Sequence, residues 1–172
     1  AILSQLMSDD AADIANDLSV AVREPVLAHL PPDEATNVRR LLNYPRESAG
    51  GIMSTGYGSV PDTSTQADAV RSFVRETAAE HQFYIYVLDG GRALCGVLDL
   101  RQLLSATPDA LIKDIMVRDV LSVPPEMDQE QVANIFSRYD LLALPVVEPQ
   151  TNKLLGVITA DEIRPLAISQ RL

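Results

Sequence analysis

The sequence predicts an α+β fold in which a segment of short helices precedes two copies of one mixed unit. The first observation is a duplication: Ile52-Met53 recurs as Ile115-Met116, and Ser59-Val60-Pro61 recurs as Ser122-Val123-Pro124, both 63 positions later. The second observation is a weaker repeat near the N-terminus, where apolar and acidic positions recur at an offset of 24. These repeats predict three domains, at residues 1–50, 51–112 and 113–172.

The first domain is predicted to be part of an α-superhelical solenoid. Its short segments have apolar residues three and four positions apart, and prolines separate them. Ser8 and Pro32 are typical helix starts, because acidic residues in a first turn complement the helix dipole. A solenoid needs about three repeats to be stable, so we expect further repeats before Ala1.

Each copy of the duplicated unit is predicted to run strand, helix, strand, strand, helix, and the pair is predicted to be pseudo-two-fold with a ligand cleft between the copies. Gly50-Gly51 precedes the first copy and predicts a flexible turn, which would also serve as a hinge. In the first copy we expect a helix over 66–76 and strands over 84–88 and 94–98. In the second copy we expect a strand over 121–123, a helix over 128–139, and strands over 144–147 and 154–159.

Composition narrows the function classes. A net charge of −10 without a cluster of basic residues argues against a nucleic-acid partner. No run approaches the roughly 18 apolar residues of a spanning helix, and no secretion signal opens the chain, so the cytoplasm is expected. The lone Cys95 is interpreted as a small buried hydrophobe. The histidines and serines form no catalytic motif, so we expect no enzyme activity.

Particular residues carry a resemblance to known families. The repeated unit, with Gly156-Val157-Ile158-Thr159-Ala160-Asp161-Glu162 near its end, resembles a tandem pair of CBS domains that hold adenosine nucleotides. Together with residues 8–13 and the junction over residues 44–53, the whole chain resembles the cytosolic part of MgtE-type magnesium transporters. The resemblance implies a homodimer that senses intracellular magnesium and closes a pore. It also implies that the transmembrane pore domain follows Leu172.

The resemblance also implies magnesium ligands among the carboxylates. Asp9 and Asp13 are four residues apart, so they share one helix face. Facing carboxylates about 4 Å apart repel by roughly 4 kcal/mol at an effective dielectric near 20, until a divalent ion neutralises them. The same residues also suit structural roles, with Asp128 as a helix cap and Glu130 as a partner of the dipole. The implied ligands are Asp9, Asp13, Asp128, Glu130, Asp140 and Glu162.

A second expectation is an adenosine nucleotide such as ATP. The first copy departs from the CBS pattern, with Asp99 where Thr is expected and Gln102 where a ribose carboxylate is expected, so at most one good site remains. The alternative function is a soluble CBS-pair sensor or adaptor for ATP or AMP that is not joined to a pore; the sequence after Leu172 would separate the two. The implied nucleotide-binding residues are Tyr84, Arg101, Thr159, Asp161 and Glu162.

Overall fold

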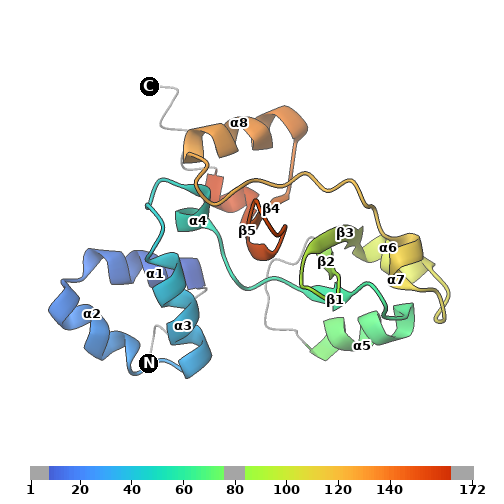
Figure 1. Ribbon diagram of the computed structural model, residues 1–172, viewed down its shortest axis with the longest axis horizontal. Helices are drawn as coiled ribbons and strands as arrows, with labels where there is room; N and C mark the ends of the chain where they lie inside the picture. The colour runs from blue at the N-terminus through green and yellow to red at the C-terminus, as the bar shows by residue number, and fades with distance from the viewer. Residues whose placement is uncertain (1–7, 76–83, 164–172) are drawn as a thin grey trace.

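The computed structural model of the protein describes residues 8–75 and 84–163. It is the predicted α+β fold: α1 to α3 lie at one end, and two small sheets stand side by side (Figure 1). Its helices are α1 (Ser8–Asp17), α2 (Val20–Leu27), α3 (Pro32–Leu41), α4 (Ala49–Ile52), α5 (Gln66–Arg75), α6 (Leu100–Ser105), α7 (Ile112–Ile115) and α8 (Gln129–Tyr139). Its strands are β1 (Ser59–Pro61), β2 (Tyr84–Leu88), β3 (Leu94–Asp99), β4 (Ala143–Val147) and β5 (Leu154–Thr159).

The N-terminal helical segment, residues 8–41, has a core of small side chains. Ala11 and Ala15 of α1 are buried with Val38 and Leu41 of α3, and these spacings of four and three residues place each pair on one helix face. Pro25 does not separate two helices as expected. It lies inside α2, whose end is closed by the Ala28 N–H donating to the Glu24 carbonyl.

The two sheets differ at their first strand. In the first copy β1 pairs parallel with β2, and β2 pairs antiparallel with β3, while the second copy contains the antiparallel pair β4 and β5. The strand expected over 121–123 is reduced to one parallel bridge between Val123 and Val146. Asp62 extends the first sheet by donating its N–H to Leu88, whereas Pro125, 63 positions later, has no N–H to donate.

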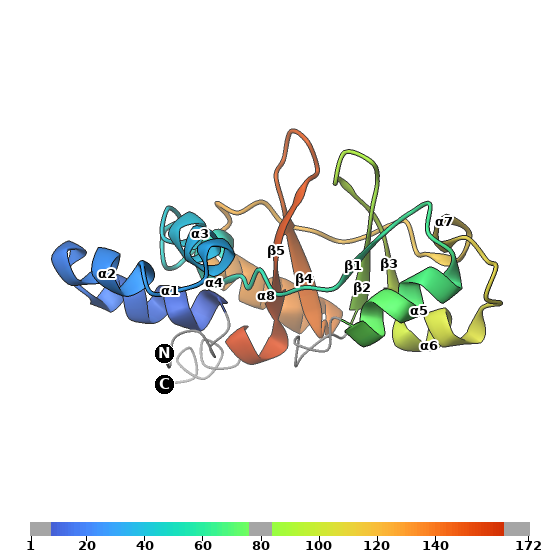
Figure 2. The ribbon, with the colours of Figure 1, turned by 90° about the horizontal axis from the view of Figure 1, so that it is seen from below.

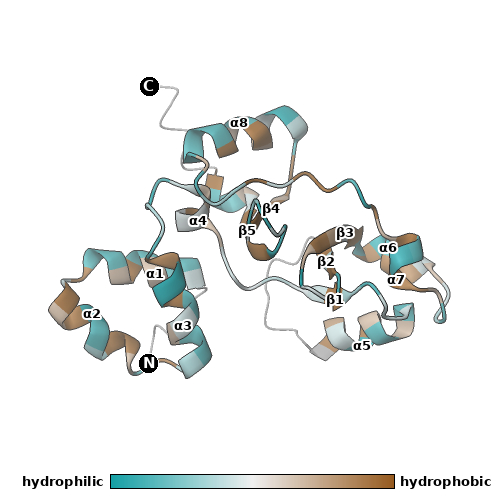
Figure 3. Cartoon of the chain, in the orientation of Figure 1, coloured by the Kyte–Doolittle hydropathy of each residue, from teal (hydrophilic) through white to brown (hydrophobic). Residues whose placement is uncertain are grey.

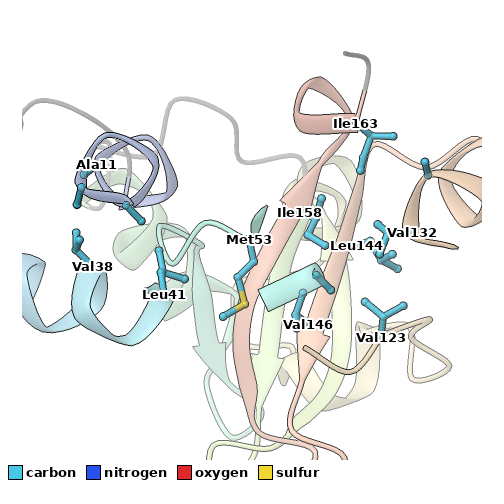
Figure 4. Close-up of a cluster of buried hydrophobic side chains, with 14 of the residues drawn as sticks. Ala11, Val38, Leu41, Met53, Val123, Val132, Leu144, Val146, Ile158 and Ile163 are labelled. Atoms are coloured by element: carbon cyan, nitrogen blue, oxygen red, sulfur yellow. The ribbon is translucent and has the colours of Figure 1, made fainter. Parts of the chain in front are cut away.

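The duplicated motifs pack crosswise between the copies. Met53 from the start of the first copy lies against Gly156 of the second, where an added Cβ would come within 2.7 Å of its sulfur. Met116 likewise lies against Gly96 of the first copy, with a corresponding distance of 2.3 Å. Figure 4 shows Met53 beside Ile158 in the core of the second copy. Each copy therefore completes its core with the Ile-Met segment of the other.

A third apolar cluster joins the two sheets. Tyr86 and Leu94 of the first copy are buried with Val147 and Val157 of the second. The hairpin turns of the two sheets stand side by side (Figure 2), and Asn152 donates to the Leu94 carbonyl between them. Figure 3 shows β2 and β3 as largely hydrophobic. In the parts of the chain that the structure describes, no helix has the length and hydropathy needed to span a bilayer.

Gly50 and Gly51 are close-packed, which corrects the expectation of a flexible turn. Both lie in α4, where the Ser48 hydroxyl accepts a hydrogen bond from the Gly51 N–H. A Cβ at Gly50 would come within 2.5 Å of the Tyr44 ring, and one at Gly51 within 2.1 Å of the Pro45 carbonyl oxygen. These glycines permit close approach of two chain segments.

The N-terminal helical segment is docked on the second copy and on the chain leading into the first. The Ser8 hydroxyl accepts hydrogen bonds from the Thr55 N–H at 2.9 Å and from its hydroxyl at 2.8 Å. Arg40 donates to the Leu155 carbonyl oxygen at 3.0 Å. A continuous cluster of buried side chains extends from α1 and α3 through Met53 to β4 and β5. This docking places the first turn of α1 near the end of β5.

Candidate functional site

Acidic side chains from two distant parts of the chain meet where the N-terminal helical segment docks. Asp9, Asp10 and Asp13 lie on α1, and Glu162 lies in the helical residues 160–163 that follow β5. All three aspartates act electrostatically on Glu162. We call these four residues the junction cluster.

Asp9 is the most buried member of the junction cluster. Its exposed fraction is 5%, and the Ser54 side chain hydrogen-bonds to its carboxylate. Its Oδ1 atom is buried and has no hydrogen-bond partner among the described residues. Burial raises the pKa of Asp9, and the charges of Asp10 and Asp13 raise it further. A buried carboxylate oxygen without a partner is costly and therefore suits a cationic ligand.

Glu162 is half-buried, and its environment disfavours a negative charge. Burial raises its pKa to about 7, with further contributions from Asp9, Asp161, Asp10 and Asp13. Carboxylates in such a cluster release their protons more readily when a divalent cation is bound, because the cation offsets their mutual repulsion. A cation beside the junction cluster would therefore favour the ionised form of Glu162.

We expect the raised pKa of Glu162 to make folding stability depend on pH. Because its pKa is higher in the folded chain than its ordinary value of 4.5, its contribution is complete below about pH 4.5 and is lost as pH rises through about 7. A ¹³C NMR titration of the carboxyl group should show a midpoint near 7, and Glu162→Gln should flatten the dependence of unfolding free energy over this range. A midpoint near 4.5 would contradict the assignment.

Asp13 also has a positively charged neighbour. Arg46, in the loop between α3 and α4, lies 3.7 Å from Asp13 and 2.7 Å from Asp17, with the distances taken between nitrogen and oxygen atoms. Asp13 and Asp17 are one helical turn apart, so one guanidinium reaches both carboxylates. Part of the negative charge of α1 is therefore neutralised by the chain itself.

The residues expected to bind a nucleotide lie at one end of the two sheets. Tyr84 begins β2 and Thr159 ends β5, both at the end opposite the hairpin turns. Thr159 is buried, and its hydroxyl donates a hydrogen bond to Asp161. Arg101 is exposed on α6 in the first copy. Glu162, next to Asp161, belongs to both the nucleotide set and the junction cluster.

Comparisons with known proteins give the family. Family models match the MgtE intracellular N domain over residues 1–47 and the CBS domain over residues 112–167. The magnesium transporter MgtE of Bacillus subtilis is 35% identical over 98% of this chain and 37% of that protein. The MgtE of Thermus thermophilus is 38% identical over 78% of this chain and 30% of that protein. The chain thus spans less than two fifths of the length of these relatives.

Solved structures extend the similarity to the fold. The crystal structure of the soluble part of a magnesium transporter has a TM-score of 0.92 and 34% identity, covering 99% of this chain and 67% of that one. The cytosolic domain of the Mg²⁺ channel MgtE, solved in complex with ATP, has a TM-score of 0.90 and 34% identity. This similarity covers 96% of this chain and 68% of that one. The chain belongs to the MgtE family. It corresponds to the cytosolic part of that family, the N domain with CBS domains.

The similarity to enzymes is limited to part of the MgtE chain. Inosine-5'-monophosphate dehydrogenase of Korarchaeum cryptofilum is 35% identical over 74 residues, which is 42% of this chain and 15% of that enzyme. The curated relatives that match most of the chain are transporters.

The remaining predicted metal ligands of the MgtE chain lie at the two ends of α8. Asp128 caps the start of this helix and accepts a hydrogen bond from the Glu130 N–H at 2.8 Å. Asp140 caps the other end with a left-handed φ of 51°. The 11 residues between the caps span roughly 16 Å at 1.5 Å per residue, so Asp140 cannot share an ion with Asp128 within one chain. Among residues 8–75 and 84–163, three or more potential ligands are nowhere grouped closely enough to hold a metal.

In the first CBS copy, the residues at the positions of the nucleotide signature form a helix cap. The Asp99 carboxylate accepts from the Gln102 N–H at 2.6 Å, and the Gln102 side chain accepts from the Asp99 N–H at 2.9 Å. This capping box occupies both side chains. Their roles explain why the first copy departs from the nucleotide pattern.

Three residues at the junction cluster were not among the expected ligands. Asp10 adds to the repulsion at Glu162, Ser54 hydrogen-bonds to Asp9, and Arg46 pairs with α1. Asp10 has a signal in the sequence, since it lies beside Asp9 in an acidic first turn. Ser54 and Arg46 have none, because they approach α1 only through the docking of the helical segment.

Proposed function

We propose that this chain is the magnesium-sensing regulatory module of an MgtE-type transporter, and that bound Mg²⁺ favours the closed pore. The observation that carries the proposal is the junction cluster: Asp9 has a buried carboxylate oxygen without a partner among the described residues, and its charge acts on Glu162, whose pKa is raised to about 7. The relatives named as magnesium transporters support the choice of ion.

Magnesium suits this cluster by its coordination chemistry. The ion prefers oxygen ligands and keeps several of its waters. Carboxylates from separate elements that are not grouped closely enough to hold it directly would therefore hold it partly through those waters. Asp9 and Asp13 come from the helical segment and Glu162 from the second CBS copy. Without the ion their repulsion opposes docking, and with it the docked state is favoured. The contact between the helical segment and the second CBS copy would then have two states, and the ion concentration would set their populations.

The module would act as a homodimer joined to the pore domain of the same protein. Support for a protein contact comes from exposed apolar side chains on α6 and α8, among them Leu100, Leu104 and Tyr139. Moving a gate from 1:99 to 99:1 takes about 5.5 kcal/mol of differential binding, so several ions per dimer are required. In a dimer, Asp128, Glu130 and Asp140 would supply further ligands between protomers.

Titration with MgCl₂ tests this function on the 172-residue chain. We expect calorimetry to detect binding and small-angle scattering to show a dimer whose radius of gyration falls as magnesium is added. NaCl at matched ionic strength is the control, because screening alone weakens repulsion between carboxylates. An unchanged radius, or the same change in NaCl, would sink the proposal.

An adenosine-nucleotide sensor is the second candidate, as an adaptor that is not joined to a pore. Nucleotide binding, which this candidate requires, is supported by the buried Thr159 beside Asp161 at the end of β5, and by the MgtE cytosolic domain solved with ATP. Calorimetry with ATP and AMP separates the functions. The sensor would be favoured if the chain bound nucleotide but not magnesium, and if Thr159→Val and Glu162→Ala each removed the nucleotide binding. No binding at millimolar nucleotide would exclude it.

A further inference from the structure

Arg46 is fixed above the carboxylates of α1 by the loop that carries it. The Pro45 carbonyl oxygen accepts hydrogen bonds from the Ser48 N–H at 3.1 Å and from the Ser48 hydroxyl at 2.7 Å. The same carbonyl oxygen lies so close to residue 51 that only glycine fits there. The backbone that precedes Arg46 is therefore held in place, which places the Arg46 side chain within reach of α1.

The charge of α1 is one-sided. The helix contains four aspartates and no basic residue. In the described part of the chain, the carboxylates of α1 form ion pairs with Arg46, which lies 2.7 Å from Asp17 and 3.7 Å from Asp13. Arg23 instead donates to the backbone carbonyl oxygen of Ala15. Asp13 in turn acts electrostatically on Glu162. Asp13 is therefore the member of the junction cluster that also pairs with a cation of the chain itself.

We propose that Arg46 is an internal competitor of the divalent cation, which sets the affinity of the junction cluster by pairing with Asp13 and Asp17. This inference rests on the proposed function, since it requires a cation at the cluster. When the ion binds, Arg46 gives up Asp13 and keeps Asp17, because the two carboxylates are one helical turn apart. When the ion leaves, the guanidinium returns to Asp13 and limits the repulsion within α1.

The strength of this competition follows from exposure. The side chains are 51% exposed for Arg46, 65% for Asp13 and 70% for Asp17. Exposed ion pairs contribute little, so loss of the pair with Asp13 should change ion affinity only about 1.5- to 5-fold. Such a contribution adjusts the working range of a sensor without abolishing its response.

The test compares Arg46→Gln with Arg39→Gln by magnesium calorimetry on the 172-residue chain at fixed ionic strength. Arg39 is the matched control because it forms an exposed ion pair with Glu24, at 3.2 Å, and not with α1. We expect Arg46→Gln to lower the half-saturating MgCl₂ concentration about 1.5- to 5-fold relative to both the unchanged chain and the control. Equal affinities for the two variants, or weaker binding by Arg46→Gln, would overturn the role of Arg46. An unchanged chain that binds no magnesium would instead overturn the proposed function.

Discussion

Asp9→Asn should stabilise the chain in the absence of magnesium and weaken its binding of magnesium. The substitution keeps the size of a buried side chain while removing a charge that burial and two neighbouring aspartates already disfavour. Where Asp9 is ionised, we expect the substitution to raise the free energy of unfolding by about 1–2 kcal/mol, because a buried charge without full hydrogen bonding is costly. Loss of one carboxylate ligand should lower magnesium affinity tenfold or more.

The opposite signs of these two effects make the experiment informative. Urea unfolding followed by circular dichroism measures stability, and calorimetry measures affinity. Asp109→Asn is the matched control, since it removes the same charge from an exposed loop position outside the junction cluster. If Asp9→Asn destabilised the chain and left magnesium binding intact, Asp9 would be a structural hydrogen-bond acceptor for Ser54.

Gly51→Ala is expected to cause the largest loss of stability. The new methyl group would lie 2.1 Å from the Pro45 carbonyl oxygen and 2.9 Å from that of Arg46, and backbone atoms cannot rotate away as a side-chain end can. Overpacking of this kind costs roughly 1–3 kcal/mol and occasionally more, so we expect a loss of about 3 kcal/mol.

Gly90→Ala provides the control for this loss. No atom lies within 4 Å of a Cβ at Gly90, and its backbone φ is not positive, so the free energy of unfolding should stay within about 0.5 kcal/mol or rise slightly. A shifted urea midpoint at unchanged slope would show that Gly51→Ala acts on the folded state. Equal midpoints for the two variants would mean that the Tyr44–Ser48 loop relaxes easily.

The expected elements were found most accurately where they are buried. Strands 84–88 and 154–159 have the expected bounds, and the helix expected over 66–76 is described as Gln66–Arg75, position 76 lying outside the described residues. Such segments have one strong periodicity or a continuous apolar run, so local signals and packing agree. The strand expected over 121–123 is only one bridge, because Pro125 has no N–H to donate. The equivalent N–H in the first copy, that of Asp62, bonds to Leu88, and this pairing is seen only in the structure.

By itself the sequence determined the duplication, the order of a helical part before a mixed part, and the family, because repeats and motifs are properties of residue order. Tertiary structure alone decided that the Ile-Met segment of each copy completes the core of the other and that Gly50-Gly51 is close-packed. It also decided which carboxylates meet: Asp9 and Glu162 are 153 positions apart in the sequence, and docking brings them together. Electrostatic effects depend on distance and burial in space, and neither is encoded in the spacing of residues along the chain.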